Sequence, residues 1–121
     1  MDRAQIEAFV AKRSTITVEC LPEDACIVGN ASAIDPITDA QIAEQIAFSL
    51  GCGNPWAWCT AKVTARYLEL ESSEYLGCCS YLSEQDFRDN SGYFEDMVAT
   101  ARAGLVDQLL EIDSSLRETE A

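Results

Sequence analysis

Residues 56–70 read WAWCTAKVTARYLEL, the longest strictly alternating stretch of the chain. In an extended backbone, successive side chains point to opposite faces. One face then carries Ala57, Cys59, Ala61, Val63, Ala65 and Tyr67, and the other carries Trp56, Trp58, Thr60, Lys62, Thr64 and Arg66. This pattern predicts a long strand whose small-residue face is covered by a helix. Residues 71–74 should turn the chain, and YLGCCSYL at 75–82 should return as an antiparallel strand.

The segments before this hairpin predict a helix, a strand and a second helix. Residues 2–13 place Ile6, Phe9 and Val10 at helical spacing, and TITVECL at 15–21 alternates as a half-buried strand. Residues 22–37 contain proline, glycine and asparagine and predict an irregular connection. A capping box at Thr38-Asp39-Ala40-Gln41 predicts the start of the next helix, and Gly51 is its expected left-handed terminator.

The segments after the hairpin predict further helices. Ser83 is the predicted N-cap of one short helical turn, and Asn90-Ser91-Gly92 is predicted to end it. A long helix should then run over residues 93–115. Its apolar stripe comprises Phe94, Met97, Val98, Ala101, Leu105, Leu109, Ile112 and Leu116.

The element order is helix, strand, helix, strand, strand, helix. We therefore expect an α+β protein with a small antiparallel sheet, a central hairpin and two to three packed helices. At 121 residues, a single acidic domain over 1–121 is the expected organisation. The sequence has no apolar run long enough to span a bilayer, and its first residues lack the apolar core of a signal peptide. These features predict a cytoplasmic protein.

The composition argues against several classes of function. The chain has 21 acidic and 8 basic side chains and no histidine, for a formal net charge of −13. Without histidine, Ser-His-Asp and Cys-His catalysis and Cys/His zinc sites are excluded. The negative charge disfavours direct binding to nucleic acid or to anionic membranes. We expect a protein that is not an enzyme and has no cofactor or metal; the alternative is a carboxylate or thiol enzyme built on Glu69/Glu71 or Cys59.

Six cysteines leave three interpretations open. They are Cys20, Cys26, Cys52, Cys59, Cys78 and Cys79. Their spacings match no C-x-x-C ligand pattern, and buried free cysteines are common in reducing compartments. Core packing is therefore the favoured interpretation, with a disulfide or metal site and a reactive thiol as alternatives.

Negative charge is concentrated in the second half of the chain. Residues 1–68 have a net charge of −3, whereas residues 69–121 have a net charge of −10. Acids near a helix N-terminus are stabilised by the helix dipole, but acids near the C-terminus are not. One hypothesis is a surface that resembles a nucleic-acid backbone, and the other is a solvated face that provides solubility. The candidate partner-binding acids are Glu84, Asp86, Asp89, Glu95, Asp96, Asp107, Glu111 and Asp113.

Trp56 and Trp58 form a second candidate surface. They share the predicted strand face with Lys62 and Arg66. If a helix covers that face, the two tryptophans belong to the core. If none does, they form an aromatic partner-binding patch, because tryptophan and arginine are frequent in interface hot spots.

Several blocks of the sequence resemble small acidic proteins of unassigned function that bacteriophages and prophages encode. The blocks are WAWCTAKVTA at 56–65, YLGCCSY at 75–81, DFR at 86–88 and GYFEDM at 92–97. Because small acidic phage proteins often inhibit host systems, the resemblance implies an inhibitor of the anti-CRISPR kind. Its partner would be a host protein or ribonucleoprotein complex that handles nucleic acid. The alternative is a structural or self-associating phage accessory protein, for example a homodimer.

Overall fold

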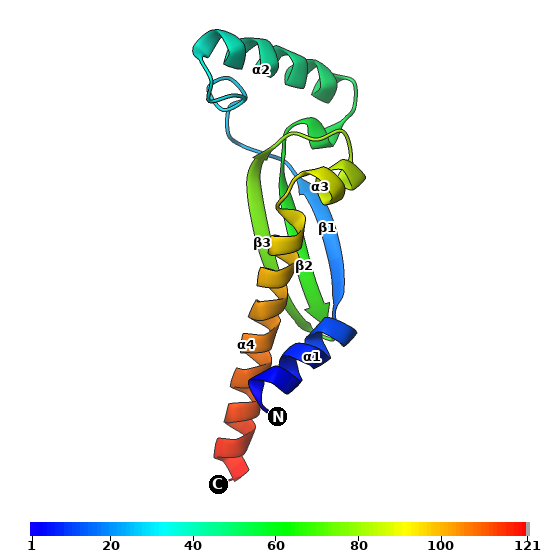
Figure 1. The fold of residues 1–121 in the computed structure, drawn as a ribbon, viewed down its shortest axis with the longest axis vertical. Helices are drawn as coiled ribbons and strands as arrows, with labels where there is room; N and C mark the ends of the chain where they lie inside the picture. Colours follow the sequence, from blue (N-terminus) through cyan, green and yellow to red (C-terminus); the bar gives the residue numbers. More distant parts are fainter. Residues whose placement is uncertain (121) are drawn as a thin grey trace. The chain divides into compact units, whose positions relative to one another are not determined.

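The computed structural model describes the backbone of residues 1–120 and the side chains of residues 1–118. Over this range the chain forms helices and strands in the predicted order (Figure 1). The elements are α1 (Arg3–Arg13), β1 (Thr15–Leu21), α2 (Pro36–Gly51), the 3-10 helix η1 (Pro55–Ala57), β2 (Cys59–Tyr67), β3 (Leu70–Cys79), α3 (Glu84–Asn90) and α4 (Phe94–Glu120). The strands form an antiparallel sheet in the order β1-β2-β3. The predicted α+β class is therefore confirmed.

The small-residue face of the central strand is buried as predicted. Cys59, Ala61, Val63 and Ala65 are all nearly inaccessible to solvent. Small side chains let neighbouring elements approach the strand closely, so this face anchors the core.

The hairpin turn lies earlier than predicted. Leu68 and Glu69 alone connect β2 to β3, and Leu68 adopts the left-handed conformation with φ of 54°. The predicted turn at 71–74 is wrong, because those residues continue β3. Cross-strand pairs keep this polar segment extended: Arg66 binds Glu71 at 3.0 Å, and the hydroxyl groups of Thr64 and Ser73 lie 2.8 Å apart.

Both predicted ends of the second helix also need correction. The N-cap is Asp35, whose carboxylate accepts hydrogen bonds from the backbone N–H and the hydroxyl of Thr38. An aspartate followed by Pro36 at the first helical position is a stronger start than the predicted capping box. At the other end, the residue with positive φ is Gly53, at 96°, and Gly51 still belongs to the helix.

The chain divides into two compact units. Unit 1 comprises Met1–Thr17, Val63–Glu74 and the segment from Glu95 onward; unit 2 comprises Val18–Lys62 and Tyr75–Phe94. Strands β2 and β3 each contribute residues to both units. That the chain is one domain stays a prediction.

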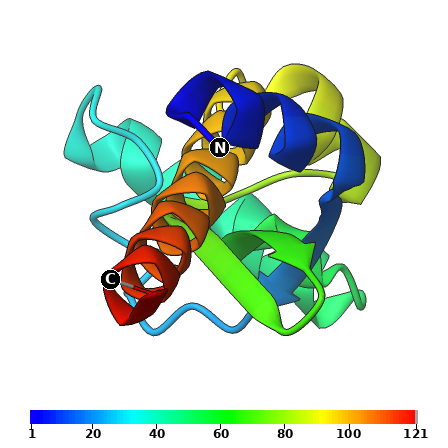
Figure 2. The ribbon, with the colours of Figure 1, turned by 90° about the horizontal axis from the view of Figure 1, so that it is seen from below.

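Unit 1 has a core between two helices and the sheet. Ile6 and Val10 of α1 pack with Ala101, Leu105 and Val106 of α4, and Ala65 of β2 completes the cluster. Figures 1 and 2 show α1 beside α4 from two directions. Gly104 lets α4 approach the sheet closely, because a Cβ atom there would overlap the side chain of Ser72.

Unit 2 has a separate core. Trp58 packs with Ile46 of α2 and Ala57 of η1, and its indole N–H donates to the carbonyl of Ala25 at 2.9 Å. This bond ties the irregular segment before α2 to the same core. None of the helices in the described part of the chain has the length and apolarity needed to cross a bilayer.

Candidate functional site

Four exposed acids of unit 1 share one side of α4. Residues of an α-helix turn by about 100° each, which places Asp96, Asp107, Glu111 and Glu118 within an arc of about 60°. Ala101 and Leu105 lie on the buried side, against α1 and the sheet. We call these four acids the acidic face of α4.

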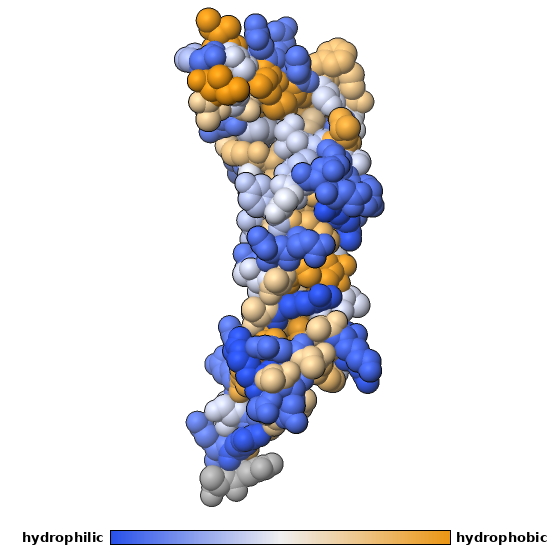
Figure 3. All heavy atoms as spheres, viewed as in Figure 1, coloured by the Kyte–Doolittle hydropathy of each residue, from blue (hydrophilic) through white to orange (hydrophobic). Residues whose placement is uncertain are grey.

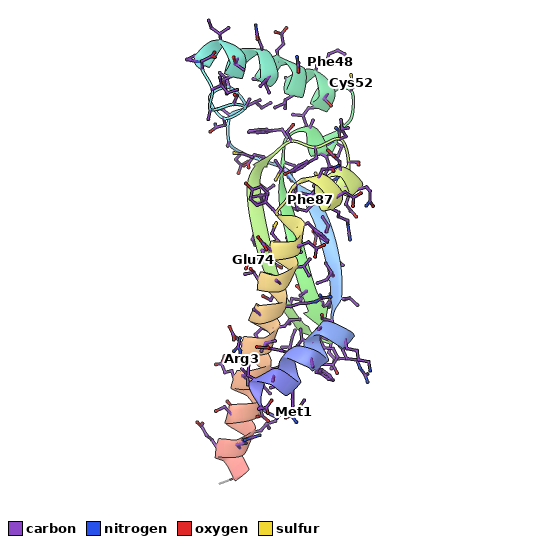
Figure 4. All side chains as sticks on the ribbon, in the orientation of Figure 1. Met1, Arg3, Phe48, Cys52, Glu74 and Phe87 are labelled. Carbon is purple, nitrogen blue, oxygen red and sulfur yellow. The ribbon has the colours of Figure 1, made fainter. Side chains whose placement is uncertain are left out.

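Asp107 is anchored by a cation of the neighbouring helix. Its carboxylate accepts from the Arg3 guanidinium at 3.0 Å, and the same Arg3 binds Glu7 at 2.9 Å. Arg3 is labelled in Figure 4. The hydrogen bond to Asp107 raises the pKa of Arg3, so the guanidinium stays charged. The pair is exposed and therefore adds little to stability.

Two further acids of α4 lie off this face. Asp113 lies 3.2 Å from Arg117 and 4.0 Å from the amino group of Met1. Glu95 is exposed in the first turn of the helix, where the dipole favours a negative charge. Asp107 and Asp113, which the helix dipole does not stabilise, thus have cationic neighbours instead.

The charge density of the acidic face can be compared with that of a nucleic acid. Asp96 and Glu118 are 22 residues apart, or about 33 Å along the helix, which gives one carboxylate per about 11 Å. A DNA strand carries one phosphate per about 3.4 Å. The acidic face therefore does not reproduce the spacing of phosphates. A partner that binds this face is attracted by its overall negative charge.

The remaining predicted acids lie in unit 2, on α3. Glu84 pairs with Arg88 at 3.1 Å, and Asp89 accepts from the Gln85 amide at 2.9 Å. Asp86 has a structural role: it accepts from the backbone N–H of Leu82 and from the Asn90 amide. The Leu82 N–H lowers the pKa of Asp86. Of the eight predicted acids, the structure thus brings Asp96, Asp107 and Glu111 together on one side of α4, places Glu95 and Asp113 elsewhere on that helix, and places three on α3 in the other unit.

Of the two alternatives for Trp56 and Trp58, the structure shows the core and not the exposed patch. Trp56 and Trp58 are 8% and 6% exposed and lie outside β2, because Pro55 and the Asn54 cap start η1 there. Trp56 stacks on Phe87 at 5.6 Å, and Trp58 packs against α2. The alternating sequence pattern therefore begins before the strand itself does. Both tryptophans belong to the core of unit 2.

The cysteines give no activated thiol at Cys59. All six are free, and Cys59 and Cys79 are buried. The hydrogen bond from Cys59 to Cys79 raises the pKa of Cys59, and burial raises it further. The same bond lowers the pKa of Cys79. A raised pKa keeps Cys59 protonated, which is the opposite of what a nucleophile needs. Cys20 is half-buried, and the others are exposed.

Two carboxylates that sequence analysis did not single out are tied to the backbone of unit 2. Asp39 is buried and accepts from the N–H groups of Gly29, Ala31 and Ser32. Glu23 accepts from Ala25 and Cys78 and from the Thr60 hydroxyl. The Cys78 N–H lowers the pKa of Glu23. In the sequence, the only sign of these two carboxylates is that they lie close to segments with glycine and proline. This sign is too general to identify Asp39 and Glu23.

Comparisons of the chain with protein-family models, with curated proteins and with solved structures find no match.

Proposed function

We propose that the protein is a non-catalytic inhibitor that binds a host protein or ribonucleoprotein complex that processes nucleic acid. The acidic face of α4 is the binding surface, and a basic nucleic-acid groove of the partner is its target. The mode of action corresponds to that of anti-CRISPR proteins, which block a defence complex. The expected location is the host cytoplasm.

The exposed acidic face is the observation that supports this proposal. A basic groove attracts a negatively charged protein over a distance set by ionic screening, about 10 Å at moderate salt. The carboxylates of Asp96, Glu111 and Glu118 are exposed on one side of a single rigid helix. A rigid helix presents its charges without a large loss of conformational entropy on binding.

A charge-reversal pull-down from bacterial lysate tests the proposal. The bait is either the wild-type chain or the triple variant Asp96→Lys, Glu111→Lys, Glu118→Lys, which reverses the three exposed acids of the face. We expect the wild-type chain to capture a nucleic-acid-handling complex that duplex DNA and high salt both release. The triple variant should bind at least about tenfold more weakly, because three attractive contacts become repulsive.

A control with the same change in net charge separates local from overall effects. It reverses Glu19, Asp24 and Glu69, which are exposed and lie off α4. This control should retain the partner at low salt. Equal loss of binding by both variants, or binding that DNA does not compete with, would reject the acidic face as the binding surface.

One observation favours self-association as a second candidate function. Ile112 and Leu116 continue the apolar stripe of α4 beyond its buried part at the four-residue interval found in coiled-coil seams. Ile112 and Leu116 are exposed and, with Met1 and Phe9, line an apolar hollow of about 200 Å³ in unit 1. Sedimentation decides this case: a dimer that Leu116→Ser dissociates supports an accessory protein, and a monomer at high concentration contradicts it.

A further inference from the structure

Large apolar side chains are exposed on α2 and on the segment before it. Val28, Ile34, Ile37 and Phe48 are between 68% and 78% exposed. Figure 3 shows hydrophobic surface over this part of unit 2, and Figure 4 labels Phe48 on the helix. Single exposed apolar residues are common, but Ile37 and Phe48 share one side of the same helix, and an exposed apolar helix side is typical of an interaction site.

The four side chains have a defined arrangement. Val28 and Ile34 line one hollow of about 430 Å³, together with Pro36 at the start of α2. Ile37 and Phe48 are three helical turns apart on the outer side of α2, about 16 Å from each other. The exposed carboxylate of Glu44 lies between them on the same side. We call Ile37, Glu44 and Phe48 the α2 surface.

The charge around the α2 surface has one sign. Residues 18–61 contain six acidic side chains and no lysine or arginine. The two basic side chains of unit 2 have other contacts: Arg88 pairs with Glu84, and Lys62 lies over the ring of Tyr75. A partner that approaches α2 therefore meets apolar side chains and negative charge without a competing cation from this segment.

We propose that the α2 surface docks a cationic amphipathic helix of a partner protein. Large apolar side chains of that helix contact Ile37 and Phe48, and its lysine or arginine side chains contact Glu44. A helix is the fitting shape because α2 has no free strand edge to extend, so recognition proceeds through side chains. The proposal concerns unit 2 and does not depend on the acidic face of α4 in unit 1.

The chemistry of the surface disfavours other occupants. A second copy of this chain would bring Glu44 and Asp35 against the same carboxylates, which costs energy through like-charge repulsion. An anionic membrane is repelled for the same reason. The experiment below includes both as outcomes.

Titration of the isotope-labelled full chain with synthetic peptides tests the proposal. The probe is an amphipathic helix of leucine and lysine, about 18 residues long, so that it spans α2. One control peptide replaces lysine by glutamate, and another replaces leucine by serine. We expect only the leucine–lysine peptide to shift the amide resonances of α2.

Variants with matched controls locate the contact. Phe48→Ser and Glu44→Lys should each weaken binding of the leucine–lysine peptide by about tenfold. Leu68→Ser and Glu69→Lys make the same chemical changes at exposed positions of the hairpin in unit 1 and should leave the affinity unchanged. Circular dichroism confirms that each variant is folded.

Four results would overturn the proposal. They are amide shifts confined to residues outside the α2 surface, equal binding of the glutamate peptide, equal losses in the variants and their matched controls, and sedimentation as a dimer that Phe48→Ser dissociates. Binding to anionic vesicles that depends on Phe48 would instead assign the surface to a membrane.

Discussion

Asp39 shows how one carboxylate can organise a segment without regular structure. Its two oxygens accept hydrogen bonds from the backbone N–H groups of Gly29, Ala31 and Ser32, the latter two at 2.8 and 2.9 Å. These donors stabilise the charged carboxylate, and the N–H of Gly29 is the main reason why the pKa of Asp39 is lowered. The segment before α2 thus depends on the ionisation of a residue inside α2.

This arrangement predicts a specific dependence of stability on pH. A lowered folded-state pKa stabilises the fold above the ordinary value of 3.8, and the contribution is lost as the pH falls through the folded-state pKa. Asp39→Asn should therefore be less stable than the wild type at pH near 7, and the difference should shrink as the pH falls below about 4. Urea unfolding at several pH values measures both effects.

The control for this prediction is Asp24→Asn, which changes the same charge at an exposed position. This control separates two effects on stability. One is the loss of the hydrogen bonds to Asp39, and the other is the weaker charge repulsion that follows when any carboxylate of an acidic chain is removed. A difference between Asp39→Asn and the wild type that stays constant with pH would contradict the assigned role of the carboxylate.

Among the elements of unit 2, α3 is held by aromatic contacts. Phe87 is fully buried and stacks on Trp56 at 5.6 Å, and it meets the rings of Tyr81 and Phe94 edge-on at 5.4 and 6.0 Å. Figure 4 labels Phe87 on this helix. A helix of seven residues is too short to be stable alone, so these contacts place it.

Truncation of two phenylalanines should therefore have very different effects. Phe87→Ala should lower the free energy of unfolding by about 3–5 kcal/mol, because it leaves a cavity among the aromatic rings. Phe48→Ala, at a position that is 74% exposed, should change it by less than about 0.5 kcal/mol. Urea unfolding monitored by tryptophan fluorescence measures both, and similar losses in the two variants would contradict the packing described for α3.

The elements with a regular hydrophobic period could be predicted from the sequence, and the others could not. β1 matches its predicted range of 15–21, and α1 and α4 begin within one residue of theirs. The position of the hairpin turn depends on cross-strand contacts such as Arg66 to Glu71, which no period reveals, whereas Asp35-Pro36 is a sequence signal for the start of α2 that outweighs the capping box. The candidate acids were found by composition, but their division between α3 and α4 depends on tertiary structure.

At the scale of the whole molecule, we expect the two units to unfold together. β2 and β3 continue from one unit into the other, so a break in either unit disrupts hydrogen bonds of a shared sheet. Both tryptophans belong to unit 2, whereas α1 and nearly all of α4 belong to unit 1. A fluorescence signal from the tryptophans can therefore be compared with a circular dichroism signal from all the helices.

If the chain is a single domain, it should unfold in urea in one cooperative transition. Tryptophan fluorescence, which reports on unit 2, and far-ultraviolet circular dichroism, which reports on all helices, should give the same urea midpoint. Two distinct midpoints would show that the units unfold separately and that the chain comprises two domains.

The stretch from residue 18 to 61 that contains no lysine or arginine also determines how the protein can be handled chemically. The primary amines of the chain are the N-terminus, Lys12 and Lys62, and none lies in that stretch. Amine-reactive reagents can therefore couple the protein to a support without a covalent change to the α2 surface. A protease that cleaves only after basic residues also leaves residues 14–62 as one peptide, so a cross-linked partner is recovered on a single fragment.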